Sequence, residues 1–176
     1  LTGASLGGQQ AIEWSVMSPE VFDYQLLIAT NARHSPWGIA FNESQRLAIE
    51  ADHTWRSDSA DAGLAGMLAA RAVALLSYRS PAGYNKTQTD DTDRIDDFRV
   101  QSYQRYQGEK LVQRFNAFSY WTLSKAMDSH NVGRGRGGIE VALSRVRART
   151  TVLSIETDIL FPPEEQQLLH RFIPNS

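Results

Sequence analysis

Two hydrophobic patterns follow one another at the start of the chain. Ile12, Val16 and Met17 lie at helical spacing, and Ser18-Pro19 ends this helix because the residue before a proline is disfavoured in the helical region. Residues 24–29 then form a short apolar run with a β-branched member, which predicts a buried parallel strand. We therefore expect mixed α/β structure over residues 1–33.

A long helical section follows. Asn116 is expected to cap the start of the fourth helix of this section, which covers residues 116–127. Residues 80–97 predict a polar loop without a core pattern, and the glycine- and arginine-rich run at 133–138 predicts a flexible joint. Apolar residues recur at helical spacing over residues 37–49, 64–79, 98–115, 116–127 and 139–147.

The α/β pattern returns near the end of the sequence. Residues 150–155 are rich in β-branched residues and predict a strand, and Pro162-Pro163-Glu164-Glu165 predicts the start of a helix with acids in its first turn. The expected organisation is an α/β segment (1–34), an all-helical insertion (35–147) and a second α/β segment (148–176).

Composition excludes several classes of protein. The 176 residues suit a single domain, the absence of cysteine excludes disulfides and thiol nucleophiles, and a net charge of −2 gives no basic field for nucleic acid. No stretch reaches the ~18 apolar residues of a membrane span, and no signal peptide is recognisable. The four histidines lack metal-ligand spacing, so we expect no metal site.

The strongest chemical motif lies near the first residue. Gly3-Ala4-Ser5-Leu6-Gly7 fits G-x-S-x-G, the tight strand-to-helix turn that exposes a nucleophilic serine. The Leu6 backbone N–H would then supply half of an oxyanion hole. A glycine-rich turn with an incidental serine fits the pentapeptide equally well, and only Leu1 and Thr2 precede it, so the strand expected before such a turn is missing.

A second candidate lies just after the last expected strand. Asp158 occupies the position where an acid that orients a histidine belongs in a parallel sheet, although it also suits a turn cap. Only His170 follows it, and this residue falls within an expected helix, where an ordinary helical role is favoured. His34, His53 and His130 precede the acid and are expected in loops or on helix surfaces.

Two arginine-containing features remain. Arg79 follows an apolar helix and would suit either a bidentate clamp on a substrate carboxylate or a solvated helix terminus. The run at 133–138 lacks the lysine and the strand of a phosphate-binding loop and favours a hinge, although its two arginines would suit a phosphate-bearing ligand.

Taken together, six blocks of sequence resemble the homoserine O-acetyltransferase family of the α/β-hydrolase superfamily. The resemblance extends from Gly3 to about Pro174, and the blocks occur in the family's order. They are GASLGGQQAIEW (3–14), IAFNE (39–43), YQRYQGEK (103–110), FNAFSY (115–120), DSHNVGRG (128–135) and DILFPP (158–163).

This resemblance implies a partial α/β-hydrolase fold with a large helical lid. It implies that Ser5 takes an acetyl group from acetyl-CoA and passes it to L-homoserine in a ping-pong cycle, with Asp158 as the triad acid. Arg79 would hold the homoserine carboxylate. It further implies a cytoplasmic enzyme of methionine biosynthesis that has no permanent cofactor and forms a homodimer through its lid helices.

The family's histidine lies in a Gly-His-Asp stretch beyond the last residue of this sequence, and the first half of its sheet is also absent. Leu1 and Ser176 therefore suggest cuts through a longer enzyme, and we expect these residues alone to be inactive. Three alternatives stay open: a homoserine O-succinyltransferase, an α/β-hydrolase esterase with water as acceptor, and a non-catalytic helical interaction module.

Overall fold

The structure, a computed structural model, describes all 176 residues and comprises two compact units. Residues 1–38 and 127–176 form one, which we call the sheet unit, and residues 39–126 form the other, the helical unit. Residues 127–147, placed in the helical insertion by sequence, belong to the sheet unit, because their turns pair with the segment after the second strand.

The sheet has three parallel strands in chain order. They are β1 (Thr2–Ala4), β2 (Tyr24–Ile28) and β3 (Arg149–Leu153), with Gly3 beside Leu27 and Leu27 beside Val152. The two later strands confirm the sequence prediction. The sequence suggested that no strand precedes the serine turn. This expectation was wrong, because residues 2–4 pair with β2.

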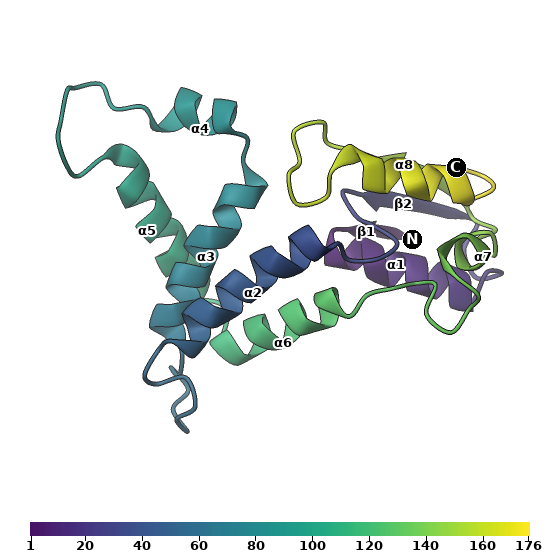
Figure 1. Cartoon of the computed structure of the whole chain (residues 1–176), viewed down its shortest axis with the longest axis horizontal. Coiled ribbons are helices and arrows are strands. Elements are labelled where there is room, and N and C mark those ends of the chain that lie inside the picture. Colours follow the sequence, from purple (N-terminus) through teal and green to yellow (C-terminus); the bar gives the residue numbers. More distant parts are fainter. The chain divides into compact units, whose positions relative to one another are not determined.

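Three helices complete the sheet unit: α1 (Leu6–Met17), α7 (Ile139–Leu143) and α8 (Pro163–Phe172). Helix α1 packs on β1 and β2, helix α8 packs on β3, and Figure 1 shows the strands between them. The core residues Ile12, Leu27, Leu143 and Leu169 are fully buried. The expected helices after Ser5 and Pro162 are therefore confirmed.

The helical unit holds most of α2 (Pro36–Glu50) and α6 (Ala117–Asp128), together with α3 (Leu64–Tyr78), α4 (Pro81–Gln88) and α5 (Arg99–Val112). Helices α3 and α5 pack closely, because Gly108 of α5 lacks a Cβ that would lie 2.6 Å from the Leu68 side chain. Its core consists of Ile49, Met67, Ala70, Leu111 and Ala117.

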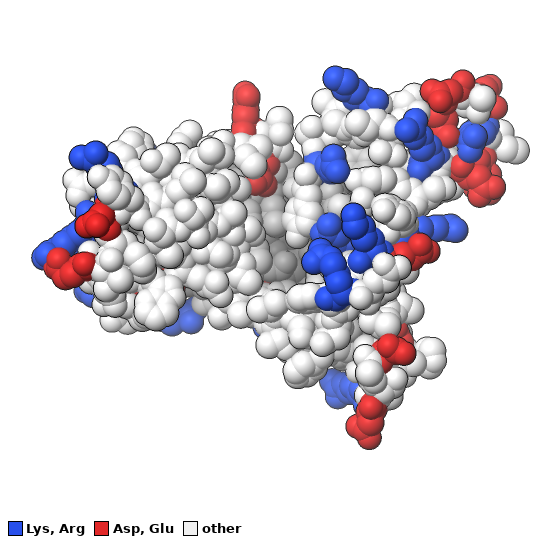
Figure 2. All heavy atoms as spheres, turned by 180° about the vertical axis from the view of Figure 1, so that it is seen from behind, with Lys and Arg blue, Asp and Glu red and all other residues white.

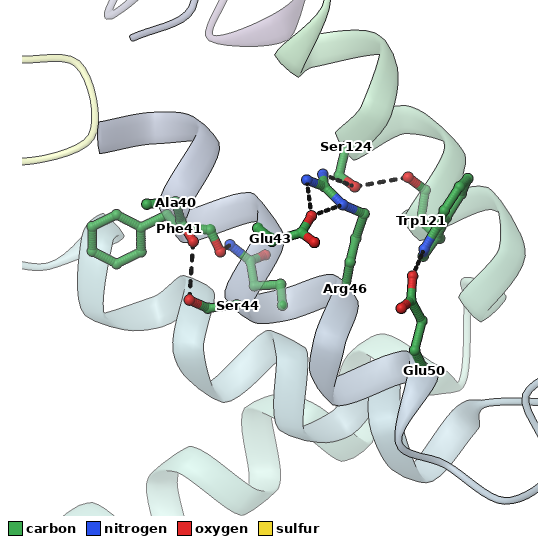
Figure 3. A network of polar contacts seen from close by, with 9 residues as sticks. Ala40, Phe41, Glu43, Ser44, Arg46, Glu50, Trp121 and Ser124 are labelled. Carbon is green, nitrogen blue, oxygen red and sulfur yellow. Dashed lines mark hydrogen bonds and ion pairs between the residues drawn. The ribbon is translucent and has the colours of Figure 1, made fainter. Parts of the chain in front are cut away.

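Polar contacts join α2 to α6 (Figure 3). Arg46 is 2% exposed, and it donates to Glu43 from Nε at 2.9 Å and to the Ser124 hydroxyl from Nη1 at 3.0 Å. Trp121 Nε1 donates to the Glu50 carboxylate at 2.7 Å. A buried guanidinium needs such partners, since breaking a buried pair leaves an uncompensated charge.

Asp52 fixes the start of α3. Its carboxylate accepts hydrogen bonds from the backbone N–H groups of Thr54 at 2.9 Å and Gly66 at 3.0 Å. These backbone donors lower the pKa of Asp52 to about 2, because they stabilise the charged form. The carboxylate thus satisfies the Gly66 N–H in the first turn of α3, which lacks an intrahelical acceptor.

Two helices differ from those expected. Residues 81–88, expected to be loop, form α4, because Pro81 suits a first helical position and the Ser80 hydroxyl accepts from the Gly83 N–H. Helix α7 ends at Leu143 rather than near Arg147, and turns lead from there into β3. The Asn116 cap is confirmed by its 2.7 Å bond from the Ser119 N–H.

Acidic side chains gather on the loop after α4 (Figure 2).

Candidate functional site

Ser5 lies at the sharp turn between β1 and α1. Its backbone has φ 52° and ψ −125°, a conformation that costs a non-glycine residue about 1–3 kcal/mol. The Ser5 N–H donates to the Ile28 carbonyl at 3.0 Å, and its own carbonyl accepts from the Gly8 N–H at 2.9 Å. The hydroxyl makes no capping bond to the helix, so it is not consumed in stabilising α1.

Glycine is required at two positions around this turn. A Cβ on Gly3 would lie 2.2 Å from the Gly7 carbonyl oxygen, and one on Gly8 would lie 2.5 Å from Thr30 Cβ. Gly7 has open space where its Cβ would be. Packing around the turn therefore requires Gly3, the first glycine of G-x-S-x-G, and Gly8, but not Gly7, the second glycine of the motif.

The first residue of α1 is Leu6, directly after Ser5. An N–H at this position has no intrahelical acceptor, and the positive end of the helix dipole favours negative charge beside it. The N–H groups of Gly8 and Gln9 already donate to the Ser5 carbonyl. The Leu6 N–H is therefore the first helix-terminal donor after Ser5 along the chain.

Asp158 follows β3 in a half-buried turn. Its Oδ1 accepts from the Leu160 N–H at 2.8 Å and from the Phe161 N–H at 2.9 Å. Trp37 Nε1 donates to the Ile159 carbonyl at 2.6 Å, which ties the turn to the start of α2. Ser5 and Asp158 both follow the carboxyl ends of strands in one parallel sheet, the edge at which ligands bind in open α/β sheets.

The histidines differ in burial from the sequence-based expectation. His170 is an exposed residue of α8 whose Nδ1 lies 3.0 Å from the Ser176 hydroxyl, as expected for an ordinary helical histidine. His34 and His130 lie in loops, as expected, but both side chains are buried rather than on the surface. The His34 ring lies 5.8 Å from the Phe161 ring, and desolvation lowers the pKa of His130.

Arg79 belongs to the helical unit and caps the end of α3. The residue is exposed, and its Nη2 donates to the Tyr103 hydroxyl at 2.9 Å. Its guanidinium carbon lies 6.0 Å from the centre of the Tyr103 ring, within cation–π range. The phenol orients the guanidinium and leaves most of its donors available for an anion.

The glycine- and arginine-rich run is anchored to α1 rather than forming a free joint. Arg136 Nη1 pairs with Glu13 at 2.8 Å and donates to the Val132 carbonyl at 2.7 Å. Arg134 donates to the Ser129 carbonyl at 2.6 Å. Each of the two guanidiniums thus has at least one partner within the sheet unit.

Sequence reasoning missed the polar residues that surround this edge of the sheet. Asn31 is 2% exposed and donates from Nδ2 to the Glu165 carboxylate at 2.7 Å. Burial raises the pKa of Glu165, which the sequence suggested only as a first-turn acid of α8. The available signal was the pair Thr30-Asn31 directly after a buried strand, a place where an amide needs a partner.

Two further properties come from the whole chain. No helix is both long and apolar enough to cross a membrane. No group of three or more histidine or acidic side chains is arranged to hold a metal ion.

Comparison with solved structures defines the class. The chain superposes on the acetyl esterase MekB with a TM-score of 0.83 at 26% identity, covering 99% of this chain and 51% of the esterase. It superposes on a homoserine O-acetyltransferase from Staphylococcus aureus with a TM-score of 0.79 at 30% identity, covering 100% of this chain and 49% of that enzyme. The fold is that of an α/β-hydrolase, in which the Ser5 turn follows β1 and Asp158 follows β3.

Sequence comparison narrows the class. The chain is 49% identical over 172 residues to the homoserine O-acetyltransferase of Cyclobacterium marinum, covering 98% of this chain and 49% of the relative. It is 43% identical over 177 residues to that of Chlorobaculum parvum, covering 99% and 50%. No family model matches. The chain is thus a homologue of the homoserine O-acetyltransferases over nearly its full length, and it spans about half the length of the curated relatives it matches.

Proposed function

We propose that the natural protein containing these residues transfers an acetyl group from acetyl-CoA to L-homoserine. The observation that carries the proposal is the strained Ser5 turn, set in a chain 49% identical to a homoserine O-acetyltransferase. A non-glycine residue held at positive φ persists only where its surroundings over-determine it, and such positions concentrate at active sites.

The proposed reaction has two steps on one serine. Ser5 Oγ attacks the thioester carbon of acetyl-CoA, the Leu6 N–H stabilises the oxyanion, and the C–S bond breaks to release CoA thiol. The homoserine hydroxyl then attacks the Ser5 acetyl ester, which restores the serine hydroxyl and gives O-acetylhomoserine. A general base takes the proton from each attacking hydroxyl and returns it to the leaving group, and we assign this role to none of the four histidines of this sequence.

Asp158 is the proposed acid that orients the base. Two backbone N–H groups engage its Oδ1, and these bonds fix the carboxylate so that Oδ2 is available to a histidine N–H. Arg79 is the proposed partner of the homoserine carboxylate, held for that purpose by Tyr103. The helical unit is the proposed lid, which lets the alcohol reach the acyl-enzyme while water is restricted. Dimerisation through this unit and a cytoplasmic location remain predictions.

An esterase is the second candidate, because the chain also superposes on the acetyl esterase MekB at 26% identity. The two functions differ in the acceptor of the acetyl group, a homoserine hydroxyl or water. The same serine, acid and oxyanion donor serve both reactions.

The test uses the full-length product of the gene that encodes these residues. We expect CoA thiol release from acetyl-CoA to depend on added L-homoserine, to yield O-acetylhomoserine, and to disappear in Ser5→Ala. Succinyl-CoA in place of acetyl-CoA tests the donor, and p-nitrophenyl acetate without homoserine tests hydrolysis. Thiol or nitrophenol release that homoserine does not accelerate would assign the esterase function instead.

A further inference from the structure

The turn directly after β2 is held from both faces of the sheet. Thr30 Oγ1 donates to the Ser5 carbonyl at 2.8 Å, and Gln166 Nε2 of α8 donates to the Thr30 carbonyl at 2.7 Å. Thr30 is fully buried, and Gly8 packs against it with no space for a Cβ. The Thr30 side chain therefore helps to hold Ser5 at its positive φ, as does the hydrogen bond from the Ser5 N–H to the Ile28 carbonyl.

Asn31 continues the same connection through side chains. Gln9 Nε2 of α1 donates to Asn31 Oδ1 at 2.9 Å, and Asn31 Nδ2 donates to Glu165 Oε2 at 2.7 Å. Gln9 is 1% exposed. We call the set of Gln9, Thr30, Asn31, Glu165 and Gln166 the Asn31 clamp. Buried polar networks rigidify one arrangement through the bonds that their members make, while Gln9 Oε1 of this set is buried without a hydrogen-bond partner.

The clamp ends in the first turn of α8, which follows the Asp158 turn directly in the chain. The Phe161 N–H donates to Asp158 Oδ1 at 2.9 Å, and the Glu165 N–H donates to the Pro162 carbonyl at 2.9 Å. Desolvation raises the pKa of Glu165, hydrogen bonds from Asn31 and Ser35 oppose this effect, and the like charges of Asp158 and Glu164 raise the pKa further. The network therefore runs from the helix that begins after Ser5 to the surroundings of Asp158, entirely within the sheet unit.

The opposite end of the same strand shows how a purely structural link is built. Ser15 Oγ of α1 donates to Gln25 Oε1 at 2.8 Å, and Gln25 Nε2 donates to Thr150 Oγ1 of β3 at 2.8 Å. This link joins helix to strands through neutral, buried groups. An ionisable, half-buried carboxyl such as that of Glu165 is not needed to join a helix to strands. Its presence at the end of β2 that lies near Ser5 therefore requires another reason.

We propose that Asn31 and Glu165 are positioning residues, whose hydrogen bond fixes the Ser5 turn relative to the Asp158 turn. Neither residue contacts the reacting atoms in this account. The proposal rests on the proposed function only in assigning Ser5 and Asp158 to one reaction. It predicts that loss of the Asn31–Glu165 bond slows chemistry at Ser5 more than it weakens substrate binding.

The test compares four variants of the full-length protein: Asn31→Ala, Glu165→Ala, Glu165→Gln and, as matched control, Gln25→Ala. Three quantities are measured: the rate at which a fluorophosphonate labels Ser5, kcat and KM for acetyl transfer, and the thermal midpoint. We expect Asn31→Ala and Glu165→Ala to lower the labelling rate and kcat by about tenfold or more, since small misplacements of a nucleophile cost up to about 10²-fold, with KM for acetyl-CoA changed less than about twofold.

Glu165→Gln keeps an oxygen that can accept from Asn31 Nδ2, and we expect it to retain most of the labelling rate. Gln25→Ala removes an equally buried amide, and we expect it to lower the thermal midpoint while leaving the labelling rate near that of the wild type. Glu165→Ala serves as the second variant if Asn31→Ala does not fold.

Full labelling in Glu165→Ala, or equal slowing in Gln25→Ala, would overturn the positioning role and leave only a structural one. A wild-type protein that fluorophosphonate does not label would overturn it as well. Labelling does not need homoserine. A wild type that is labelled but does not acetylate homoserine therefore refutes the proposed function, while the comparison of the variants still decides the role of the clamp.

Discussion

The two ends of strand β2 are built from similar residues for different purposes. At its amino end, Gln25 links Ser15 to Thr150 through neutral side chains, and none of these three residues has a positive φ. Just beyond its carboxyl end, Asn31 links α1 to the ionisable Glu165. The same end of the sheet carries Ser5, which is held at a positive φ.

The difference shows where this fold accepts strain and buried ionisable groups. Neutral amide links satisfy buried polar atoms and hold helix to sheet at low cost. Strain at Ser5 and burial of Glu165 both lower stability, and both lie at the edge of the sheet where Asp158 also lies. We therefore propose that the carboxyl edge of the sheet is organised for chemistry and the amino edge for stability.

The largest expected effect is that of Ser5→Ala, set against Ser15→Ala within the helix that follows it. In the full-length protein, Ser5→Ala should reduce kcat for acetyl transfer by about 10³-fold to 10⁶-fold, as loss of a nucleophile does. Ser15→Ala should keep kcat and lose about 1–3 kcal/mol of unfolding free energy, because the buried Gln25 Oε1 loses the donor of its hydrogen bond. Steady-state kinetics and urea unfolding measure the two. Equal kcat in both variants would contradict the distinction drawn between the two ends of β2.

Asp158→Asn should have the next largest effect. Asparagine keeps the oxygen that accepts from Leu160 and Phe161, so the turn is retained, but it cannot stabilise the histidine tautomer a triad needs. We expect kcat to fall by about 10⁴-fold with little change in thermal midpoint. Asp23→Asn at the amino edge serves as the control and should leave kcat unchanged. A modest loss in Asp158→Asn would limit Asp158 to capping its turn.

Two neighbouring glycines sharpen the comparison within the turn itself. Gly8→Ala places a Cβ 2.5 Å from the buried Thr30, which its bond to the Ser5 carbonyl prevents from moving freely. We expect it to destabilise the protein by about 1–3 kcal/mol, as overpacking does. Gly7→Ala meets open space and should be neutral or slightly stabilising. Chemical unfolding of both variants decides, and equal destabilisation would show that the turn is packed differently.

The smallest expected effect concerns pH. Burial raises the pKa of Glu165 above 4.5, so the folded protein holds this proton to a higher pH than the unfolded chain does. The Glu165 contribution to unfolding free energy therefore falls as pH rises from 4.5 through the raised pKa. Glu165→Gln removes this loss, and its stability relative to the wild type should rise over the same window.

Urea unfolding of the wild type and Glu165→Gln between pH 4 and pH 7 measures this difference. Gln25→Ala is the control at the other end of β2, because it removes no titrating group and should change stability equally at every pH. A constant difference for Glu165→Gln would mean that Glu165 titrates as an exposed acid does.

Much of the fold follows from the pattern of the sequence. Runs such as residues 24–28 and 149–153 are short, apolar or β-branched, and Ser18-Pro19 ends α1 as its chemistry requires. The strand Thr2–Ala4 was missed because it is stabilised by pairing with β2 rather than by its own pattern. Helix α4 was missed because its residues are polar and its start depends on the Ser80 cap.

The candidate site was predictable only in part. Ser5 and Asp158 stand in local motifs, so their places at the turns after β1 and β3 follow from sequence. Asn31 and Glu165 are separated by more than a hundred residues of intervening chain, and only the packing of α8 beside the turn after β2 brings them together. Spacing along a sequence carries no signal for such a contact.

The central claim is that Ser5 carries the acyl group at the carboxyl edge of the sheet. The most direct measurement is mass spectrometry of the full-length protein, quenched and digested after mixing with acetyl-CoA in the absence of homoserine. We predict an acetyl group on the peptide that contains Ser5, lost when homoserine is added before quenching and absent in Ser5→Ala. Acetylation of another residue, undiminished in Ser5→Ala and discharged by homoserine, would contradict the account.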